Sequence, residues 1–312
     1  MNFLKLIRWQ NLAIICITMF LLRYCLLFPL LEAKSISSLL SHFHFVLLVL
    51  ATVLFSAAGY IINDVYDVDT DKVNKPEKII VGKYISVKLA ENLNLVFNII
   101  AIGIGIYLSF ALNLRFISIL GVLIAGMLYF YSTTYKGVLL MGNIIIAIFS
   151  ALVPFIILIA ELPLLYSKYH AFIIPSGFNF NFLIAWFGYY SLFAFLISLI
   201  REIIKDMEDF EGDTSYGKHT LPVKYRIVVS KIVVSSLITI FVAFILYVLF
   251  KYLYNPITIV YASILVIAPI IYTAWLVFRA TDKKNYAKAS FTCKLIMVIG
   301  LLYVVLANAF IL

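Results

Sequence analysis

The chain has 312 residues, of which 64% are hydrophobic and only 12% charged, and its mean hydropathy is +1.08. Soluble domains contain about 45–50% apolar residues, so this composition excludes a soluble domain of normal size and indicates an integral membrane protein. The formal net charge of +9 would suit nucleic-acid binding, but the positions of the basic residues have another explanation.

Nine apolar segments are each long enough to cross a hydrocarbon core of about 30 Å at about 1.5 Å per residue. They are residues 9–31, 44–62, 91–112, 115–133, 138–160, 181–200, 228–250, 257–278 and 291–311. We predict an all-α, polytopic membrane protein in which about nine helices surround a central cavity and residues 1–312 form a single domain. The first segment has no small-residue cleavage site, so we expect it to be retained as a span rather than removed as a signal peptide.

The basic residues gather on one side of this predicted topology. The N-terminus and the connections after segments 2, 4, 6 and 8 share one side, and that side, with the adjoining segment ends, holds 19 of the 24 Lys and Arg residues. Cytoplasmic loops carry such an excess, so we predict that this side is cytoplasmic and that the protein lies in the cell membrane. The charge then reflects membrane topology, and no nucleic-acid partner is expected.

Two acidic motifs share the spacing +3, +4. The first is Asp64, Asp67 and Asp71 at the end of segment 2, and the second is Asp206, Asp209 and Asp213 at the end of segment 6; counterparts are 142 positions apart. At about 100° per residue, each set falls on one helical face, whereas Asp69 points elsewhere. Segments 2 and 6 should cross the membrane in the same direction, so both carry matching carboxylates at their ends on the predicted cytoplasmic side.

Like charges on one face repel each other unless a cation is present. Carboxylate oxygens suit a hard cation, and Mg²⁺ is usually held by one or two carboxylates together with water and phosphate oxygens. We therefore predict that the six motif aspartates are Mg²⁺ ligands and that the two motifs together hold a diphosphate. The alternatives are a solvated loop and an EF-hand, but the EF-hand glycine and glutamate positions hold Lys72 and Lys78.

Basic and polar residues near the motifs favour a diphosphate over a bare cation. Lys72, Asn74 and Lys78 follow the first motif, while the stretch YFYSTTYKG places Tyr131 and Lys136 at the end of segment 4 on the same side. Lys136 either sets topology or contacts the diphosphate. The expected diphosphate-binding residues are Asn63, Lys72, Asn74, Lys78, Tyr131 and Lys136.

These residues resemble the motifs of the UbiA-type intramembrane prenyltransferases. The family's NDxxDxxxD corresponds to the run from Asn63 to Asp71, and its Asn-x-Pro corresponds to Asn74 and Pro76. The second motif, the following GKHTLPV, and YSTTYK with Asn143 beyond it are also similar to family segments. Lys78 stands where the family commonly has arginine, so the charge is kept but the bidentate guanidinium is lost.

The resemblance implies Mg²⁺-dependent transfer of a prenyl group from an isoprenyl diphosphate to a membrane-associated acceptor, with membrane lipids around the protein. It implies catalytic roles for Asp67, Asp71, Asp209 and Lys136. The extended motif REIIKDMEDFEGD resembles the geranylgeranylglyceryl-phosphate geranylgeranyltransferase branch. An aromatic acceptor, such as 4-hydroxybenzoate or a quinone precursor, is the alternative. An ion-coupled transporter is the alternative from another class, although transporters place carboxylates near the bilayer midplane.

Overall fold

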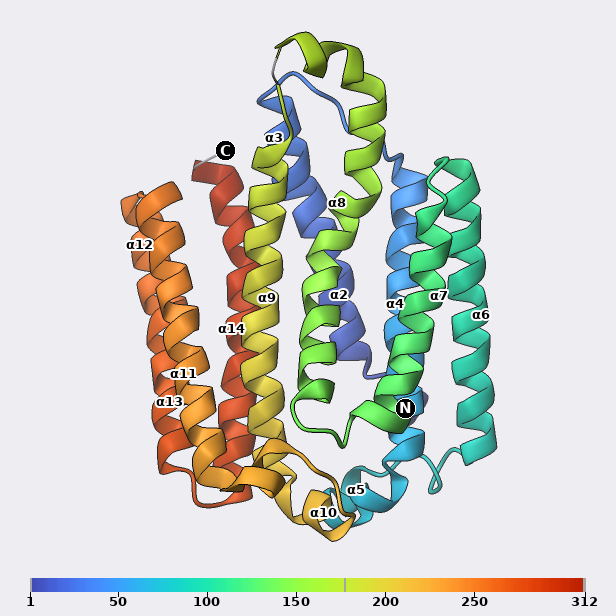
Figure 1. Ribbon diagram of the computed structural model, residues 1–312, viewed down its shortest axis with the longest axis vertical. Coiled ribbons are helices and arrows are strands. Elements are labelled where there is room, and N and C mark those ends of the chain that lie inside the picture. The colour runs from blue at the N-terminus through green and yellow to red at the C-terminus, as the bar shows by residue number, and fades with distance from the viewer. Residues whose placement is uncertain (1, 177, 311–312) are drawn as a thin grey trace. The chain divides into compact units, whose positions relative to one another are not determined.

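The computed structural model describes residues 2–176 and 178–310, and within these ranges nine helices are long and apolar enough to cross a membrane. Their order is shown in Figure 1. The first five spans are formed by α2 and α3 (Trp9–Leu22 and Phe28–Glu32, joined by the π-helical turn η1, Arg23–Leu27), α4 (His42–Tyr66), α6 (Val87–Ala111), α7 (Phe116–Phe130) with the π-helical turn η3 (Tyr131–Tyr135), and α8 (Met141–Ser176). The other four are formed by α9 (Asn181–Glu208), α11 (Leu221–Tyr252), α12 and α13 (Pro256–Tyr261 and Ala268–Arg279, joined by the π-helical turn η4, Ala262–Ile267), and α14 (Lys283–Phe310). The short helix α1 (Asn2–Leu6) precedes the first span, and α5 (Val68–Asn74), η2 (Pro76–Lys78) and α10 (Phe210–Ser215) lie in connections between spans. The predicted all-α polytopic fold is confirmed, and the central cavity stays a prediction.

Several helices extend beyond the predicted apolar segments. The sixth was expected to end at residue 200 and ends at Glu208, and the ninth begins at Lys283 instead of residue 291. Hydropathy marks where a helix leaves hydrocarbon, but backbone hydrogen bonds continue the helix into the polar region. The last residue of the predicted ninth segment, 311, lies outside the described residues.

The chain forms two compact units, and the first comprises Met1–Tyr135 with Val153–Gly188. In this unit α4 packs along α6 and α7, with alternating directions (Figure 1). The side-chain oxygens of Ser41 and Ser86 cap the amino ends of α4 and α6 by accepting hydrogen bonds from the His44 and Leu89 amides, each at 3.2 Å. The alternation brings the end of α4, the start of α6 and the end of α7 to the same end of the unit.

A buried polar cluster lies at the opposite end of α4 in the same unit. Glu161 of α8 is fully buried and accepts hydrogen bonds from Ser38 Oγ at 2.9 Å and from the amides of Leu39 and Leu40. Arg23 is also buried, donates to the Leu40 carbonyl, and lies 4.3 Å from the centroid of the Phe45 ring. A single carboxylate thus accepts hydrogen bonds from two backbone amides of the loop between α3 and α4.

Glu161→Ala is expected to lower stability by about 3–5 kcal/mol, because it leaves buried backbone donors without an acceptor and a buried cation without its neighbouring charge. Thermal unfolding of the purified protein in detergent would measure the loss. Glu32→Ala is the matched control, since Glu32 is an exposed acid at the end of α3. Equal effects of the two substitutions would contradict the structural role of Glu161.

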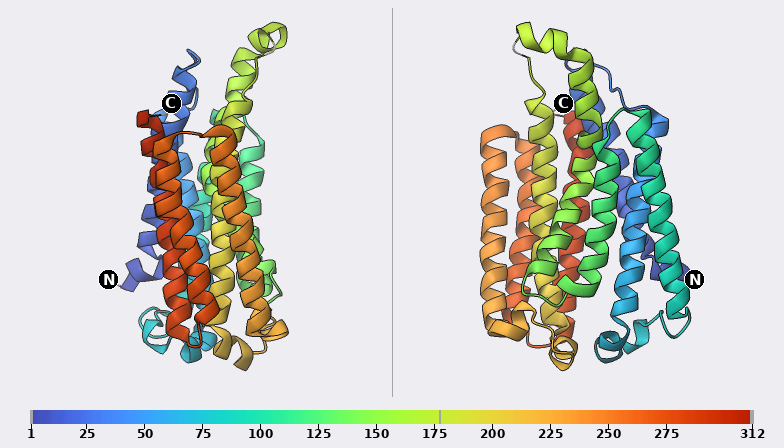
Figure 2. Two further views of the ribbon diagram at one scale, coloured as in Figure 1. Left: turned by 90° about the vertical axis from the view of Figure 1, so that its left-hand side faces the viewer. Right: turned by 45° about the vertical axis from the view of Figure 1, so that its right-hand side comes forward.

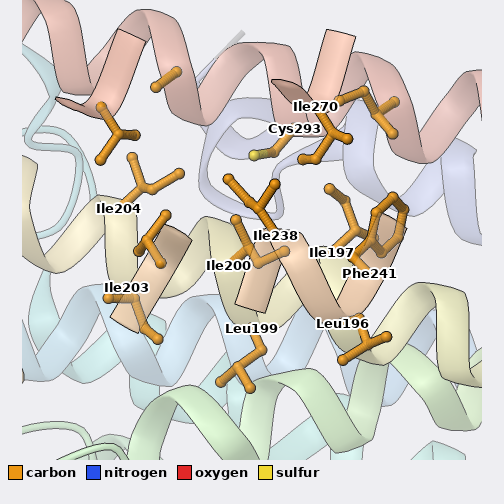
Figure 3. Close-up of a cluster of buried hydrophobic side chains, with 14 of the residues drawn as sticks. Leu196, Ile197, Leu199, Ile200, Ile203, Ile204, Ile238, Phe241, Ile270 and Cys293 are labelled. Atoms are coloured by element: carbon orange, nitrogen blue, oxygen red, sulfur yellow. The ribbon is translucent and has the colours of Figure 1, made fainter. Parts of the chain in front are cut away.

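The second unit comprises Lys136–Leu152 with Tyr189–Leu312. Its α13 and α14 form a neighbouring pair, seen in orange and red in Figure 2. Buried side chains of α9, including Ile197 and Ile200, meet Phe241 of α11 and Ile270 of α13 in one apolar core (Figure 3). This core fixes the position of α9 within the unit, and with it the position of the polar residues at the carboxyl end of α9.

Helices α9 and α14 approach each other closely within this unit. A Cβ atom placed on Gly300 would lie 2.2 Å from the ring of Phe193, so this position of α14 has room only for glycine. The contact sets the register of α14 against α9 and positions the polar residues nearer the carboxyl end of α9.

Candidate active site

Both acidic motifs contain a helix break at their middle aspartate. Asp67 separates α4 from α5 with φ −93° and ψ −3°, and Asp209 separates α9 from α10 with φ −96° and ψ 12°. The amide of each still donates to the carbonyl four residues earlier, at 3.0 Å for Asp67 and 2.9 Å for Asp209. The prediction of one uninterrupted helical face is therefore wrong at this position. Aspartate is a weak helix former, so a break costs less at these positions than at a strong helix former.

In the first motif, an asparagine orients the middle carboxylate. Asn63 Nδ2 donates to Asp67 Oδ2 at 2.8 Å, and both residues are buried, with Asp67 only 7% exposed. The sequence places them at i and i+4, so the helix turn itself brings the amide and the carboxylate together. The bond therefore fixes the orientation of the Asp67 carboxylate within the first motif.

Arg8 is a site residue that the sequence analysis counted only as a topology charge. Its Nη2 lies 2.7 Å from Asp64 Oδ1, and its guanidinium lies 4.9 Å from the centroid of the Tyr60 ring. Arg8 and Asp64 are 56 positions apart, and no spacing pattern links them. The short helix α1 brings them together by packing Leu6 against Ile61 and Val81.

The other predicted residues of this unit have different environments. Lys72 is exposed and pairs with Asp69 at 2.7 Å, and Asp71 is half-buried. Asn74 is buried at the end of α5, and Lys78 is exposed in η2. Tyr131 begins the π-helical turn η3, which packs against α4. The unit thus brings Tyr131 to the helix that carries the first motif.

In the second motif, an asparagine from another helix holds the first carboxylate. Asn143 Nδ2 of α8 donates to Asp206 Oδ2 of α9 at 2.8 Å. Two turns further along α8, the hydroxyls of Ser150 and Ser198 are 2.7 Å apart. These two bonds join α8 and α9 in antiparallel register, so Asp206 is fixed by interhelical packing and not only by its own helix.

Asp213 is the most buried carboxylate of the second motif, with 5% of its surface exposed. Gly217, at φ +65°, ends α10, and the Lys218 amide returns to the Asp213 carbonyl at 2.9 Å. This turn brings Lys218 Nζ within 3.3 Å of Asp213 Oδ1. Burial raises the pKa of the Asp213 carboxyl, while the charges of Lys218 and Lys136 oppose the rise.

Lys136 therefore lies near the second motif, as expected from its predicted side of the membrane. The loop that follows it is tied to the loop after α10, because the His219 amide donates to the Gly137 carbonyl at 2.8 Å. The side chain of Lys218 packs against Gly137, where a Cβ atom would lie 3.4 Å from Lys218 Cγ. Lys218 was missed as a site residue, although the turn signal at Gly217 indicated a return of the chain.

The donor chemistry of both motifs fits Mg²⁺. In the described part of the chain, no three His, Cys, Asp or Glu side chains converge as in a metal site complete with protein ligands. Mg²⁺ usually takes one or two carboxylates and completes its shell with water and phosphate oxygens. Buried carboxylates such as Asp67 and Asp213 require a positive partner. The residues therefore fit an ion completed by a substrate phosphate.

The sequence profile of the UbiA prenyltransferase family matches residues 21–299. The chain belongs to this family. The UbiA match includes both acidic motifs, Lys136 and every candidate residue except Arg8. It also argues against the ion-coupled transporter considered from the sequence.

Named relatives within the UbiA family include the digeranylgeranylglyceryl phosphate synthases of two archaea. The Sulfolobus acidocaldarius protein is 34% identical over 58% of this chain and 57% of its own length. The Methanosphaera stadtmanae protein is 31% identical over 80% of this chain and 83% of its own length. The chain thus spans little more than half of the first relative and most of the second.

Solved structures show the same UbiA fold. A digeranylgeranylglyceryl phosphate synthase structure is 23% identical, with a TM-score of 0.63, and covers 98% of this chain and 97% of its own. A UbiA homologue from Archaeoglobus fulgidus, bound to GPP and Mg²⁺, is 19% identical with a TM-score of 0.58, covering 98% of this chain and 99% of its own. The protein is therefore a multi-pass membrane protein of the UbiA fold.

Proposed function

We propose that the protein transfers a geranylgeranyl group from its diphosphate to geranylgeranylglyceryl phosphate in a Mg²⁺-dependent reaction. The family membership supports prenyl transfer, and the names of the relatives in two archaea support the acceptor. The observation that carries the proposal is the pair of matching acidic motifs, each with a buried aspartate and with lysines at the second.

Asp64, Asp67, Asp71, Asp206, Asp209 and Asp213 would supply the Mg²⁺ ligands. When bound, Mg²⁺ would neutralise charge on the diphosphate and so make it a better leaving group. In the reaction, the allylic C–O bond breaks and the diphosphate leaves with the electron pair. The acceptor hydroxyl oxygen then forms the new ether bond, and its proton passes to the departing diphosphate. Lys136 would stabilise the charge that grows on the leaving oxygens.

The surrounding residues have supporting roles in this proposal. Asn63 orients Asp67, as its hydrogen bond indicates. Lys72, Asn74, Lys78 and Tyr131 would contact the diphosphate directly or through water. The apolar helices would hold the prenyl chain and exclude water, which would otherwise capture the allylic cation.

The test is a transfer assay with purified protein in lipid nanodiscs and radiolabelled geranylgeranyl diphosphate. We expect product with geranylgeranylglyceryl phosphate, none after EDTA, and recovery when excess Mg²⁺ is added. Transfer to 4-hydroxybenzoate and none to the glyceryl phosphate would replace the proposed acceptor with the aromatic alternative. No transfer to any acceptor in the presence of Mg²⁺ would refute the activity.

We also propose that the protein lies in the cell membrane with its N-terminus and both acidic motifs on the cytoplasmic side, as the bias of basic residues supports. A membrane-impermeant thiol reagent should label Tyr254→Cys in intact cells but label Lys83→Cys only after lysis. Both positions are exposed in connections between spans. The reverse labelling pattern would contradict the orientation.

A further inference from the structure

Four ionisable residues of the second unit form a cluster that the proposed reaction does not use. Glu202 of α9 accepts from Arg201 Nη1 at 2.6 Å and from Lys205 Nζ at 3.2 Å. Lys294 of α14 lies within electrostatic range of Arg201. We call Arg201, Glu202, Lys205 and Lys294 the basic cluster.

The packing of α9 on α14 explains how these residues meet. Phe193 of α9 contacts Gly300 of α14. The two helices run antiparallel, so a step forward along α9 and a step backward along α14 lead in the same direction. At about 1.5 Å per residue, Arg201 lies about 12 Å beyond Phe193 on α9, and Lys294 lies about 9 Å before Gly300 on α14. The close approach at glycine therefore aligns the cations of the two helices.

The cluster lies near the carboxyl end of α9 and in the amino-terminal half of α14, on the predicted cytoplasmic side where the second acidic motif also lies. Three cationic side chains thus gather around the carboxylate of Glu202. A phosphate monoester, with a charge near −2 at neutral pH and several acceptor oxygens, is an anion that such a group of donors suits.

The side chains also have the geometry for binding such an anion. Arg201 and Lys205 keep 26% and 29% of their side-chain surface exposed, so neither side chain is fully enclosed by protein. Arg201 Nε is buried and has no hydrogen-bond partner among the described residues. A guanidinium edge that includes Nε suits phosphate oxygens, which arginine commonly binds through two donors.

The cluster lies close to the second acidic motif. Arg201 and Lys205 precede Asp206 by five positions and one, which corresponds to about 7.5 and 1.5 Å along the helix. In a glyceryl phosphate, only a few bonds separate the phosphate from the hydroxyl. An acceptor held here by its phosphate would therefore present its hydroxyl within about one helical turn of the carboxylate.

We propose that the basic cluster binds the phosphate monoester of the acceptor lipid. The inference rests on the proposed function and adds a site for the acceptor that is separate from the diphosphate-binding residues. It assigns a role to the Arg-Glu-x-x-Lys segment of the extended second motif. An aromatic acceptor without a phosphate would not need this group of cations.

The test compares Arg201→Gln, Arg201→Lys and Lys294→Gln in nanodiscs of phosphatidylcholine, with Lys288→Gln as control. Lys288 is an exposed lysine of the same helix α14, and its substitution removes the same charge. Each Gln variant should raise KM for geranylgeranylglyceryl phosphate by about 10–100-fold, the scale of one hydrogen bond to a charged group. KM for geranylgeranyl diphosphate should stay within about twofold, which also shows that the variants fold. Arg201→Lys should be intermediate, because it keeps the charge but loses the planar donors.

A second acceptor, geranylgeranylglycerol, lacks the phosphate. It distinguishes a loss of phosphate binding from a general change in the structure of the variant. Wild type and variants should use it equally poorly. Equal losses with both acceptors, or unchanged KM for the phosphate acceptor, would overturn the inference and leave the cluster as an ion network that joins α9 to α14. If the wild-type protein prenylates only 4-hydroxybenzoate, both the inference and the proposed acceptor are overturned. If the wild-type protein uses geranylgeranylglyceryl phosphate and the variants have the same KM for it, only the inference is overturned.

Bilayer lipids offer the same chemistry, so the assay is repeated with phosphatidic acid in the nanodiscs. Competition by phosphatidic acid against the acceptor in wild type, but not in Arg201→Gln, would support recognition of a phosphate monoester. Competition of equal strength in both proteins would place the phosphate elsewhere and overturn the inference.

Discussion

Asp67→Ala and Asp209→Ala are each expected to abolish prenyl transfer, with a loss of more than about 10³-fold in kcat, while the protein remains folded. Loss of one transition-state donor costs about 10²–10³-fold, and removal of a proposed metal ligand should exceed it. Each aspartate is the middle member of its motif and sits at the helix break. Removing one of three like charges relieves repulsion in the metal-free protein, which offsets the hydrogen bond lost at Asn63.

Asp69→Ala is the matched control for this prediction. Asp69 carries the same charge two positions from Asp67, but its side chain is 68% exposed and pairs with Lys72. Turnover should remain within about threefold of wild type, because an exposed ion pair contributes little. Steady-state kinetics at saturating Mg²⁺ and Mn²⁺ binding followed by electron paramagnetic resonance would measure activity and metal affinity separately. If Asp69 proved as essential as Asp67, the assignment of Asp67, and not Asp69, as a Mg²⁺ ligand would be wrong.

The architecture could be predicted well from the sequence, because hydrocarbon imposes a simple constraint. A backbone in lipid must satisfy its own hydrogen bonds, so each long apolar run has to be a helix. The same reasoning could not locate the helix ends. Glu208 and Lys283 lie outside the apolar runs but inside helices, since the helical hydrogen bonds do not depend on side-chain hydropathy.

The local part of the candidate site was also predictable, and its tertiary part was not. The pairing of Asn63 with Asp67 follows from a spacing of four residues. The partners of Asp64 and Asp206 are Arg8 and Asn143, which lie 56 and 63 positions away. Only packing of separate helices brings them together. Asn143 entered the sequence analysis through a family resemblance, and Arg8 did not enter as a site residue.

The motifs also show where helical periodicity gives a wrong answer. A spacing of +3, +4 predicts one face only if the helix is continuous, and the chain breaks at Asp67 and again at Asp209. The break recurs at an offset of 142 positions, the same offset that relates the aspartates themselves. The repeated break indicates that the local conformation, as well as the acidic pattern, is part of each motif.

Lys136→Ala is expected to lower kcat by about 10²–10³-fold with a much smaller change in KM for geranylgeranyl diphosphate. Its ammonium is a compact charge close enough to Asp213 to affect that carboxyl, and the bond from the His219 amide to the Gly137 carbonyl fixes the loop beside it. If it contacts the departing diphosphate, the interaction strengthens as the C–O bond breaks, so the loss falls on the transition state and therefore on kcat.

The control for Lys136 is Lys284→Ala, which removes an exposed lysine on the same predicted side of the membrane. A lysine that only sets topology is one of 19 basic residues on that side, and its loss should hardly change insertion or rate. Lys136→Arg sharpens the comparison, because it keeps the charge for topology but replaces a compact ammonium with a broad guanidinium. We expect Lys136→Arg to insert normally and to recover only part of the lost kcat. A kcat near wild type for Lys136→Ala, with Lys284→Ala unchanged as well, would remove Lys136 from the site and leave it as a topology residue.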